Sequence, residues 1–210
     1  MNTFPHYPVN ARSLAKRKPI FGIGINDADY LTQPKVNGKK VFCPFYARWM
    51  GMLGRCYSDA YHEKMPTYID CTVVDEWLTF SVFRRWMDRQ PWEGSQLDKD
   101  ILIPGNKIYS AEACVFVSGE VNSLLLGRGA RRGEYPQGVS LCRDTGRYLA
   151  GLMKYGKGNN LGRFDTPEEA SEVYKAAKSA HIIKIAQSQQ PNVKVALIAI
   201  AENMTRMNVG

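Results

Sequence analysis

The residues best suited to chemistry lie in one short stretch, residues 97–110, which has the sequence LDKDILIPGNKIYS. Asp98 and Asp100 flank Lys99, and a Pro-Gly-Asn turn sequence follows them. Turn residues between two short apolar runs predict a β-hairpin. A carboxylate on such a hairpin can hold a divalent cation, which offsets the charge that develops on a phosphate during hydrolysis. The same stretch can instead be a structural hairpin that its two aspartates cap and shape.

Two amphipathic helices are predicted ahead of this hairpin. Apolar and aromatic residues recur at three- and four-residue spacing through residues 44–58 and again through residues 74–89. This spacing is typical of a helix that is buried on one face. All four tryptophans lie between Trp49 and Trp92, so we expect the main core in this region. After the hairpin, a short helix that carries Asn122 is predicted.

Charge and composition favour a nucleic-acid partner. The 210 residues carry a formal net charge of +8, and 44% of them are apolar. A chain of this length and apolar content can bury a real core, and a basic globular protein commonly binds a polyanion, most often nucleic acid. Between Arg128 and Arg163 there are eight lysines and arginines against two acids, so this region carries +6 of the net charge.

Cysteine usage and the N-terminal sequence favour a reducing compartment. The five cysteines form no CxxC pair, which argues against a zinc knuckle and against a disulfide framework. The N-terminus lacks the apolar segment of a secretory signal. The longest aliphatic run, VALIAIA, is too short to cross a bilayer. We therefore expect a cytoplasmic protein with no membrane partner.

Changes in composition predict five segments. Residues 1–40 form a basic N-terminal arm, and its RSLAKRK cluster either lies on phosphates or is a solvated tail. The other segments are a module over residues 41–126 that contains the hairpin, a basic Gly/Arg linker over 127–134, a sheet with a helix over 135–190, and a C-terminal helix or tail over 191–210.

Alternating apolar and small or polar residues over 138–164 predict a three-stranded sheet. A helix start follows, with Thr166 as the N-cap, Pro167 at the first helical position and Glu169 completing a capping box. Strict alternation turns one set of side chains towards the helix and the other set outward. The outward-facing residues are expected to be Ser140, Cys142, Arg147, Leu149, Gly151 and Met153.

Several features of this region resemble the APETALA2/ERF-type DNA-binding domain. In chain order they are Gly138-Val139, Gly146-Arg147-Tyr148, Ala150, Leu161-Gly162, Phe164-Asp165-Thr166, Glu169-Ala170 and Tyr174. The resemblance implies a three-stranded antiparallel sheet packed on one helix, with its exposed face in the major groove of double-stranded DNA. The family carries arginine and tryptophan at several groove-facing positions. This chain departs from that pattern at Ser140, Cys142 and Asn160, which bears on the sequence it would bind.

Particular basic residues are expected to contact the DNA. Arg147 is the best candidate on the outer face of the sheet. Residues at predicted strand ends are expected to contact phosphates, namely Arg143, Lys154, Lys157 and Arg163. The linker arginines, Arg128, Arg131 and Arg132, are expected to reach phosphates or the minor groove. A sheet-helix module that binds a protein is the alternative.

Residues 49–126 resemble a phage-encoded family with HNH-endonuclease-like sequences, often joined to the domain just described. The resemblance rests on WMGMLGRCYS, DEWLTFSVFRRWM and LDKDILIPGNKIYSAEACVFVSGEVN, which follow one another in the family's order. It implies a β-hairpin packed on a helix that together hold one divalent cation. Asp98 then matches the metal-binding acid and Asn122 the second metal ligand, and the implied cofactor is Mg²⁺ or another divalent cation.

Two of the four roles in such a site are not matched. Lys99 stands where the general-base histidine belongs, and Ala113 stands where the orienting asparagine is expected. A lysine carries its proton at neutral pH unless burial or neighbouring cations depress its pKa. In an active site, Lys99 would stabilise phosphate charge while Asp100 acted as the base. The favoured interpretation is a degenerate hairpin that does not cut, in which Lys99 contacts DNA.

The predicted fold class is α+β, with a helical ββα HNH-like N-terminal module and a three-stranded antiparallel sheet packed on one helix. The predicted function is double-stranded DNA binding by a protein derived from an HNH homing-endonuclease scaffold, acting as a phage regulator. Two alternatives stay open. One is a metal-dependent HNH-type DNA endonuclease, and the other is a phage accessory protein that binds a host protein.

Overall fold

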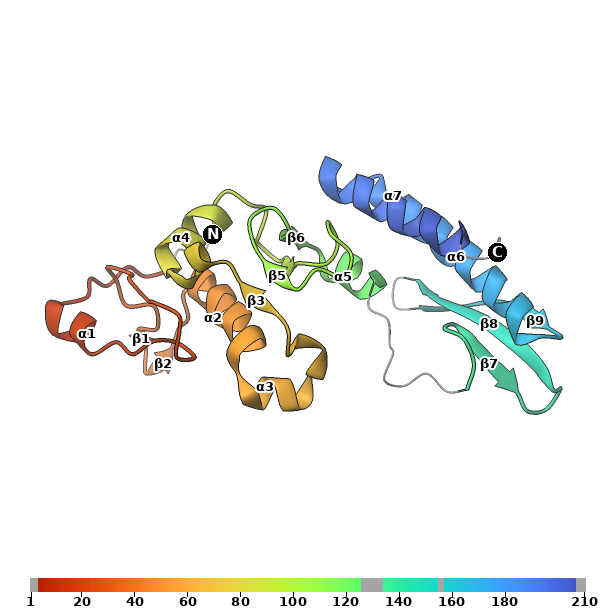
Figure 1. Cartoon of the computed structure of the whole chain (residues 1–210), viewed down its shortest axis with the longest axis horizontal. Helices are drawn as coiled ribbons and strands as arrows, with labels where there is room; N and C mark the ends of the chain where they lie inside the picture. The colour runs from red at the N-terminus through yellow and green to blue at the C-terminus, as the bar shows by residue number, and fades with distance from the viewer. Residues whose placement is uncertain (1–3, 126–133, 155–156, 207–210) are drawn as a thin grey trace. The chain divides into compact units, whose positions relative to one another are not determined.

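The chain folds into two compact units, Met1–Val117 and Ser118–Gly210. In this computed structural model, residues 4–125, 134–154 and 157–206 are described (Figure 1). The secondary structure is α+β, as predicted. The division between the units falls after Val117, ahead of the short helix that carries Asn122, whereas composition placed a boundary after residue 126.

The first unit is built from helices joined by very short strands. Its elements are α1 (Ala11–Ala15), β1 (Lys35–Val36), β2 (Lys39–Lys40), α2 (Pro44–Tyr57), α3 (Asp59–Lys64), η1 (Pro66–Tyr68), β3 (Thr72–Val73), η2 (Asp75–Leu78), α4 (Phe80–Met87), β4 (Gln96–Asp98), β5 (Ile108–Tyr109) and β6 (Val115–Val117), where η marks a 3-10 helix. β1 and β2 pair antiparallel, as do β4 and β6, whereas β3 and β5 pair in parallel.

An aromatic core holds the first unit together, in the region where the tryptophans predicted it. Trp49 and Phe83 are fully buried, and the ring of Phe80 packs 5.5 Å from that of Trp49, measured between centroids. The indole Nε1 of Trp49 donates a 2.7 Å hydrogen bond to the carbonyl of Trp77. This bond satisfies the one polar group that Trp49 buries and joins α2 to η2.

The second predicted helix is interrupted at Thr79. Residues 75–78 form η2 and residues 80–87 form α4, while Thr79 is extended, with φ −94° and ψ 123°. The backbone of Ile25 accounts for the break, because its N–H donates to the carbonyl of Leu78 and its carbonyl accepts from the N–H of Phe80. The apolar side chains of the predicted helix are nevertheless buried, because η2 and α4 both direct these side chains into the core.

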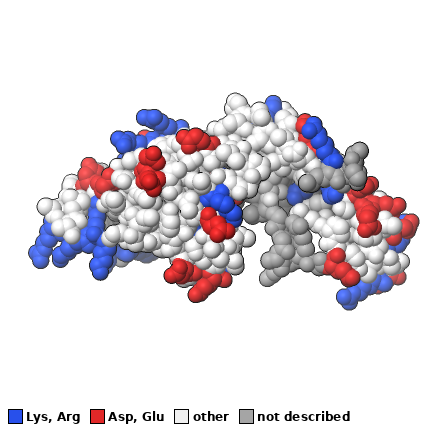
Figure 2. Space-filling view, in the orientation of Figure 1, with Lys and Arg blue, Asp and Glu red and all other residues white. Residues whose placement is uncertain are grey.

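The N-terminal segment packs onto the first unit rather than extending from it as an arm. The guanidinium of Arg17 donates hydrogen bonds to the carbonyls of Asn26, Ala28 and Tyr30 at 2.7, 2.6 and 3.1 Å. Ala28 and Tyr30 are buried in the core. Lysine and arginine side chains gather over α1, β1 and β2 (Figure 2). The exposed cations of this segment are Arg12, Lys16, Lys18, Lys35, Lys39 and Lys40.

The second unit is a three-stranded antiparallel sheet packed on a helical hairpin. Its elements are α5 (Gly119–Leu125), β7 (Val139–Cys142), β8 (Arg147–Lys154), β9 (Lys157–Phe164), α6 (Pro167–Ala186) and α7 (Pro191–Arg206), with strand order β7-β8-β9. α6 packs on the sheet and α7 packs along α6 (Figure 1). The three strands are confirmed, and the segment left open as a helix or tail is a helix.

The start of α6 is confirmed in detail. The Thr166 hydroxyl accepts a hydrogen bond from the N–H of Glu169, and the Glu169 carboxylate accepts one from the N–H of Thr166. These reciprocal bonds satisfy two backbone donors at the end of the strand and the start of the helix. In the part of the chain that the structure describes, no helix has both the length and the apolar character needed to cross a membrane.

Gly138 and Gly146 provide a matched test of how the sheet meets α6. Both have positive φ, +80° and +67°, but a Cβ on Gly138 would collide with the ring of Tyr174, whereas one on Gly146 would meet open space. We expect Gly146→Ala to cost about 1–2 kcal/mol, from backbone strain alone. We expect Gly138→Ala to cost roughly 2–5 kcal/mol, because it adds overpacking.

Urea unfolding followed by far-UV circular dichroism would measure both costs. Tryptophan emission serves as the control, because all four tryptophans lie in the first unit and their transition should not move. If Gly138→Ala and Gly146→Ala lower the free energy of unfolding equally, the close packing of Tyr174 on Gly138 is contradicted.

Candidate functional site

The predicted hairpin around the Pro-Gly-Asn turn does not form, because the two strands that flank this turn pair with other strands. Asp98 of β4 pairs with Val115 of β6, so sixteen residues separate the paired strands. The Pro104-Gly105 turn is present, with φ +77° at Gly105. The strand that follows this turn, β5, pairs with β3 in parallel and not with β4. The stretch 99–107 is therefore a loop that its own side chains must shape.

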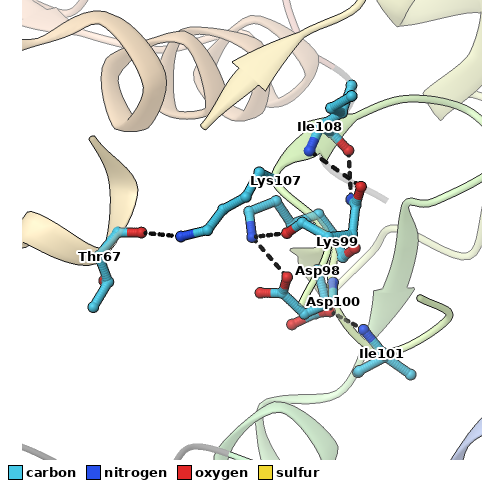
Figure 3. A network of polar contacts seen from close by, with 8 residues as sticks. Thr67, Asp98, Lys99, Asp100, Ile101, Lys107 and Ile108 are labelled. Carbon is cyan, nitrogen blue, oxygen red and sulfur yellow. Dashed lines mark hydrogen bonds and ion pairs between the residues drawn. The ribbon is translucent and has the colours of Figure 1, made fainter. Parts of the chain in front are cut away.

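Asp98 shapes the chain where it leaves β4. One carboxylate oxygen, Oδ1, accepts hydrogen bonds from the backbone N–H groups of Asp100 and Ile101 at 2.7 and 2.8 Å (Figure 3). Burial raises the pKa of Asp98, and these two hydrogen bonds act in the opposite direction by stabilising the carboxylate. This arrangement is the capping role that the structural interpretation of the hairpin predicted.

Lys99 and Asn106 close the loop by bonding to each other's backbone. The Lys99 ammonium donates to the carbonyl of Asn106 and to Oδ1 of Asp100, both at 2.7 Å (Figure 3). In return, the side-chain amide of Asn106 donates to the carbonyls of Lys99 and Ile108 at 2.9 and 2.6 Å. The side chain of Lys99 is 7% exposed. It therefore contributes to the loop's stability and offers little surface to a DNA phosphate.

The ligands predicted for a metal ion are divided between the two units. Asp98 belongs to the first unit, and Asn122, on α5, belongs to the second. Within the described ranges, no three or more His, Cys, Asp or Glu side chains come together as a metal site. Ala113 is buried in the first unit and supplies no polar side chain. Of the two predicted ligands, the first unit thus supplies Asp98.

The outer face of the three-stranded sheet carries the side chains predicted to lie there. In the register, Cys142 is opposite Arg147 and Ser140 is opposite Leu149. Directly opposed residues of an antiparallel pair point to the same face. On the other face, Ala150 and Leu152 are buried. The predicted alternation is therefore confirmed, and the outer face is available to a ligand.

A β-bulge brings Arg163 and Asn160 onto this same outer face. The two residues are three positions apart, so regular alternation would place them on opposite faces. The register shifts between Ala150 and Gly151, which leaves Leu161 without an opposed partner and places Arg163 opposite Leu149. The side chain of Asn160 accepts a 2.9 Å hydrogen bond from the N–H of Gly162, across the bulge. Arg163, the next-to-last residue of β9, is thus near the strand end, as predicted, and also lies on the outer face.

Asp165 holds Arg147, the residue favoured for DNA contact. The Nε of Arg147 lies 2.9 Å from Oδ1 of Asp165, and the two side chains are 47% and 79% exposed. The N–H of Asp165 donates to the carboxylate of Glu169, so the capping box also fixes the backbone of Asp165. The pair engages Nε and leaves the two Nη groups of Arg147 for other partners. The sequence analysis did not predict the role of Asp165. The only signal for it was the position of this acid between the last strand and the N-cap of α6.

The remaining predicted contacts are at the ends of the strands or outside the described residues. Arg143 is exposed in the turn after β7, and Lys157 is exposed at the start of β9, where it pairs with Lys154 of β8. Hydrogen bonds from Thr145 lower the pKa of the half-buried Cys142 thiol. The linker arginines Arg128, Arg131 and Arg132 fall outside the described residues.

Replacing Lys99 separates its structural role from a chemical one. We expect Lys99→Met to lower the free energy of unfolding by about 1–3 kcal/mol, because the enclosed carbonyl of Asn106 loses its donor. The control is Lys107→Met. Lys107 is exposed and makes one hydrogen bond, to the carbonyl of Thr67, so its loss should cost no more than about 0.5 kcal/mol. Urea unfolding followed by tryptophan emission would measure both, and equal stabilities would refute the structural role.

Searches with this chain among protein-family models, curated proteins and solved structures find no match. The resemblances to HNH-like and APETALA2/ERF-type sequences therefore rest on the residues quoted for them, and what they imply stays a prediction. The chain is assigned to no family.

Proposed function

We propose that this chain binds double-stranded DNA, with the outer face of β7, β8 and β9 against the major groove. The observation that carries the proposal is the pair Arg147 and Arg163 on one face of the sheet, while α6 covers the other face. A small β-ribbon fits the width of the major groove. Arginine is the side chain best suited to bonding a guanine edge and phosphates.

Asp165 supports a contact with bases in addition to phosphates. A carboxylate on a surface that binds only phosphates would repel them. The ion pair with Asp165 engages Nε of Arg147 and favours orientations in which the two Nη groups point away from the carboxylate. Such a bias before binding lowers the entropy lost on binding by a small amount, since the pair is exposed. Arg143 and Lys157, at the ends of the strands, suit phosphate contacts.

Removing the two arginines of the outer face should weaken duplex binding more than removing two arginines elsewhere. We expect Arg147→Ala with Arg163→Ala to lower affinity for a mixed-sequence duplex. The double variant should also reduce the log-log salt slope by about 0.9 for each lost phosphate contact. The measurement is fluorescence anisotropy of a labelled duplex over a range of salt concentrations.

The matched control is Arg85→Ala with Arg89→Ala, which makes the same change in net charge at exposed positions of the first unit. If both double variants lose affinity equally, binding reflects net charge and the assignment of the sheet face fails. A wild-type chain that does not bind the duplex would refute the proposed function itself.

The endonuclease alternative receives less support from the hairpin. Oδ1 of Asp98 accepts two backbone hydrogen bonds, and Lys99, in the place of the general base, is enclosed and paired with Asp100. Descent from a homing-endonuclease scaffold and a role as a phage regulator are parts of the proposal that rest on the resemblance alone. No contact in the described residues favours a host protein as the partner.

Incubation with supercoiled plasmid separates binding from cleavage. With Mg²⁺ or Mn²⁺ present, we expect retardation of the plasmid on a gel and no nicking. The matched variant is Asp98→Asn, since an amide oxygen can still accept the two backbone hydrogen bonds but carries no charge for a metal ion. Metal-dependent nicking that Asp98→Asn abolishes would make the chain a nuclease and overturn the binding-only interpretation.

A further inference from the structure

Arg55 is a mostly enclosed cation whose hydrogen-bond donors have no acceptor. It lies in the last turn of α2, and its guanidinium carbon is 5.3 Å from the centroid of the Tyr109 ring. Its Nε is buried and makes no hydrogen bond. Across the described residues, no hydrogen bond or ion pair satisfies this guanidinium. The side chain is nevertheless partly exposed, so one edge of the guanidinium is open to a ligand.

Three tyrosines surround this guanidinium. Tyr61, Tyr68 and Tyr109 all interact electrostatically with Arg55, and the rings of Tyr61 and Tyr68 pack edge to face with centroids 5.5 Å apart. Burial raises the pKa of Tyr68 and of Tyr109, and the charge of Arg55 opposes that rise in both. Among the contacts that the structure describes, none of the three hydroxyls has a hydrogen-bond partner. Arg55 and the tyrosines thus bring several unused donors together.

No carboxylate of the residues that the structure describes forms an ion pair with Arg55. Asp100, which interacts with Tyr68, is bonded to Lys99 at 2.7 Å, and Oδ1 of Asp98 accepts two backbone N–H groups. An arginine cannot release its proton in a protein, and a charge taken out of water without a partner is costly. The Tyr109 ring offsets part of that cost through a cation–π contact. The face of a ring is not a hydrogen-bond acceptor for the N–H groups that lie in the plane of the guanidinium, however. The missing partner is an anion.

The number and kind of donors select the anion. A guanidinium presents two parallel donors to one oxyanion, and three hydroxyls can donate to further oxygens. A carboxylate has two oxygens, whereas inorganic phosphate presents four to these donors, and a phosphodiester adds two bridging oxygens to its two unbridged ones. We propose that Arg55, with the hydroxyls of Tyr61, Tyr68 and Tyr109, binds a phosphate group at the surface of the first unit. The site is independent of the sheet face and does not rest on DNA binding there.

The phosphate can belong to free inorganic phosphate or to a nucleic-acid backbone, and two experiments on the full chain distinguish these sources. The first follows thermal unfolding by tryptophan emission, which reports on the first unit alone, in sodium phosphate and in sodium chloride of equal ionic strength. Phosphate should raise the wild-type midpoint, because a ligand that binds only the folded state stabilises it. Arg55→Met should lose that rise.

The matched control is Arg85→Met, an exposed arginine of α4 in the same unit. Phosphate stabilises many proteins weakly through exclusion from their surface. That general effect is shared by both variants, so the difference between them isolates the site. Without phosphate, Arg55→Met should be at least as stable as the wild type, since methionine replaces an unpaired charge with an apolar chain. Tyr68→Phe, which removes only a hydroxyl, should weaken phosphate binding about threefold to tenfold and keeps the test available if Arg55→Met does not fold.

The second experiment repeats the duplex titration over salt with Arg55→Met and Arg85→Met. A smaller salt slope in Arg55→Met alone assigns the site to a phosphodiester, even where free phosphate has no effect. A phosphate-specific rise without any duplex binding supports the site and refutes the proposed function. If neither phosphate nor duplex distinguishes Arg55→Met from Arg85→Met, the inference is overturned and Arg55 is a packing residue.

Discussion

The shortness of its strands is the constraint on which the first unit depends. No strand of this unit exceeds three residues, so ladder hydrogen bonds alone cannot hold its segments in place. Side chains that donate hydrogen bonds to backbone carbonyls hold these segments in place instead. Trp49 bonds to Trp77, Arg17 to the carbonyls of three alternate residues of the N-terminal segment, and Lys99 to Asn106. Each of these bonds joins residues that are at least seven positions apart in the sequence.

Against that background Arg55 is the exception. Arg17 and Lys99 are cations that the fold encloses, and both have every contact that a structural cation needs. The side chain of Arg55 is partly enclosed, yet among the described residues its guanidinium contacts the Tyr109 ring and has no hydrogen-bond acceptor. Buried donors in proteins are normally satisfied, as those of Arg17 and Lys99 are here. Leaving the guanidinium of Arg55 without an acceptor does not stabilise the fold. This contrast assigns Arg55 to a ligand and Lys99 to the loop, although Lys99 was the residue that its place in the sequence suggested for chemistry.

The second unit could be predicted further than the first because its signals are local. Alternation over β7 and β8 and the capping box at Thr166 depend on residues that are neighbours in the chain. The parallel pairing of β3 with β5, and the bond pair that Ile25 makes around Thr79, depend on segments far apart in the sequence. The face on which Arg163 lies could not be predicted for a related reason, since one bulged residue exchanges the faces of every residue beyond it. Nothing in the local pattern marks Leu161 as that residue.

Exposure of the counter-ion separates cations that can exchange partners from those that cannot. Asp165 is 79% exposed beside Arg147, so water and salt screen the pair and its net stabilisation is small. A base edge or a phosphate can therefore compete for Arg147 at little cost to the fold. Lys99 is 7% exposed and bonds to a backbone carbonyl as well as to Asp100, so drawing it towards a ligand would leave that carbonyl without a donor. The same two residue types, a basic side chain beside an aspartate, thus suit the proposed recognition on the sheet and stabilise the loop after β4.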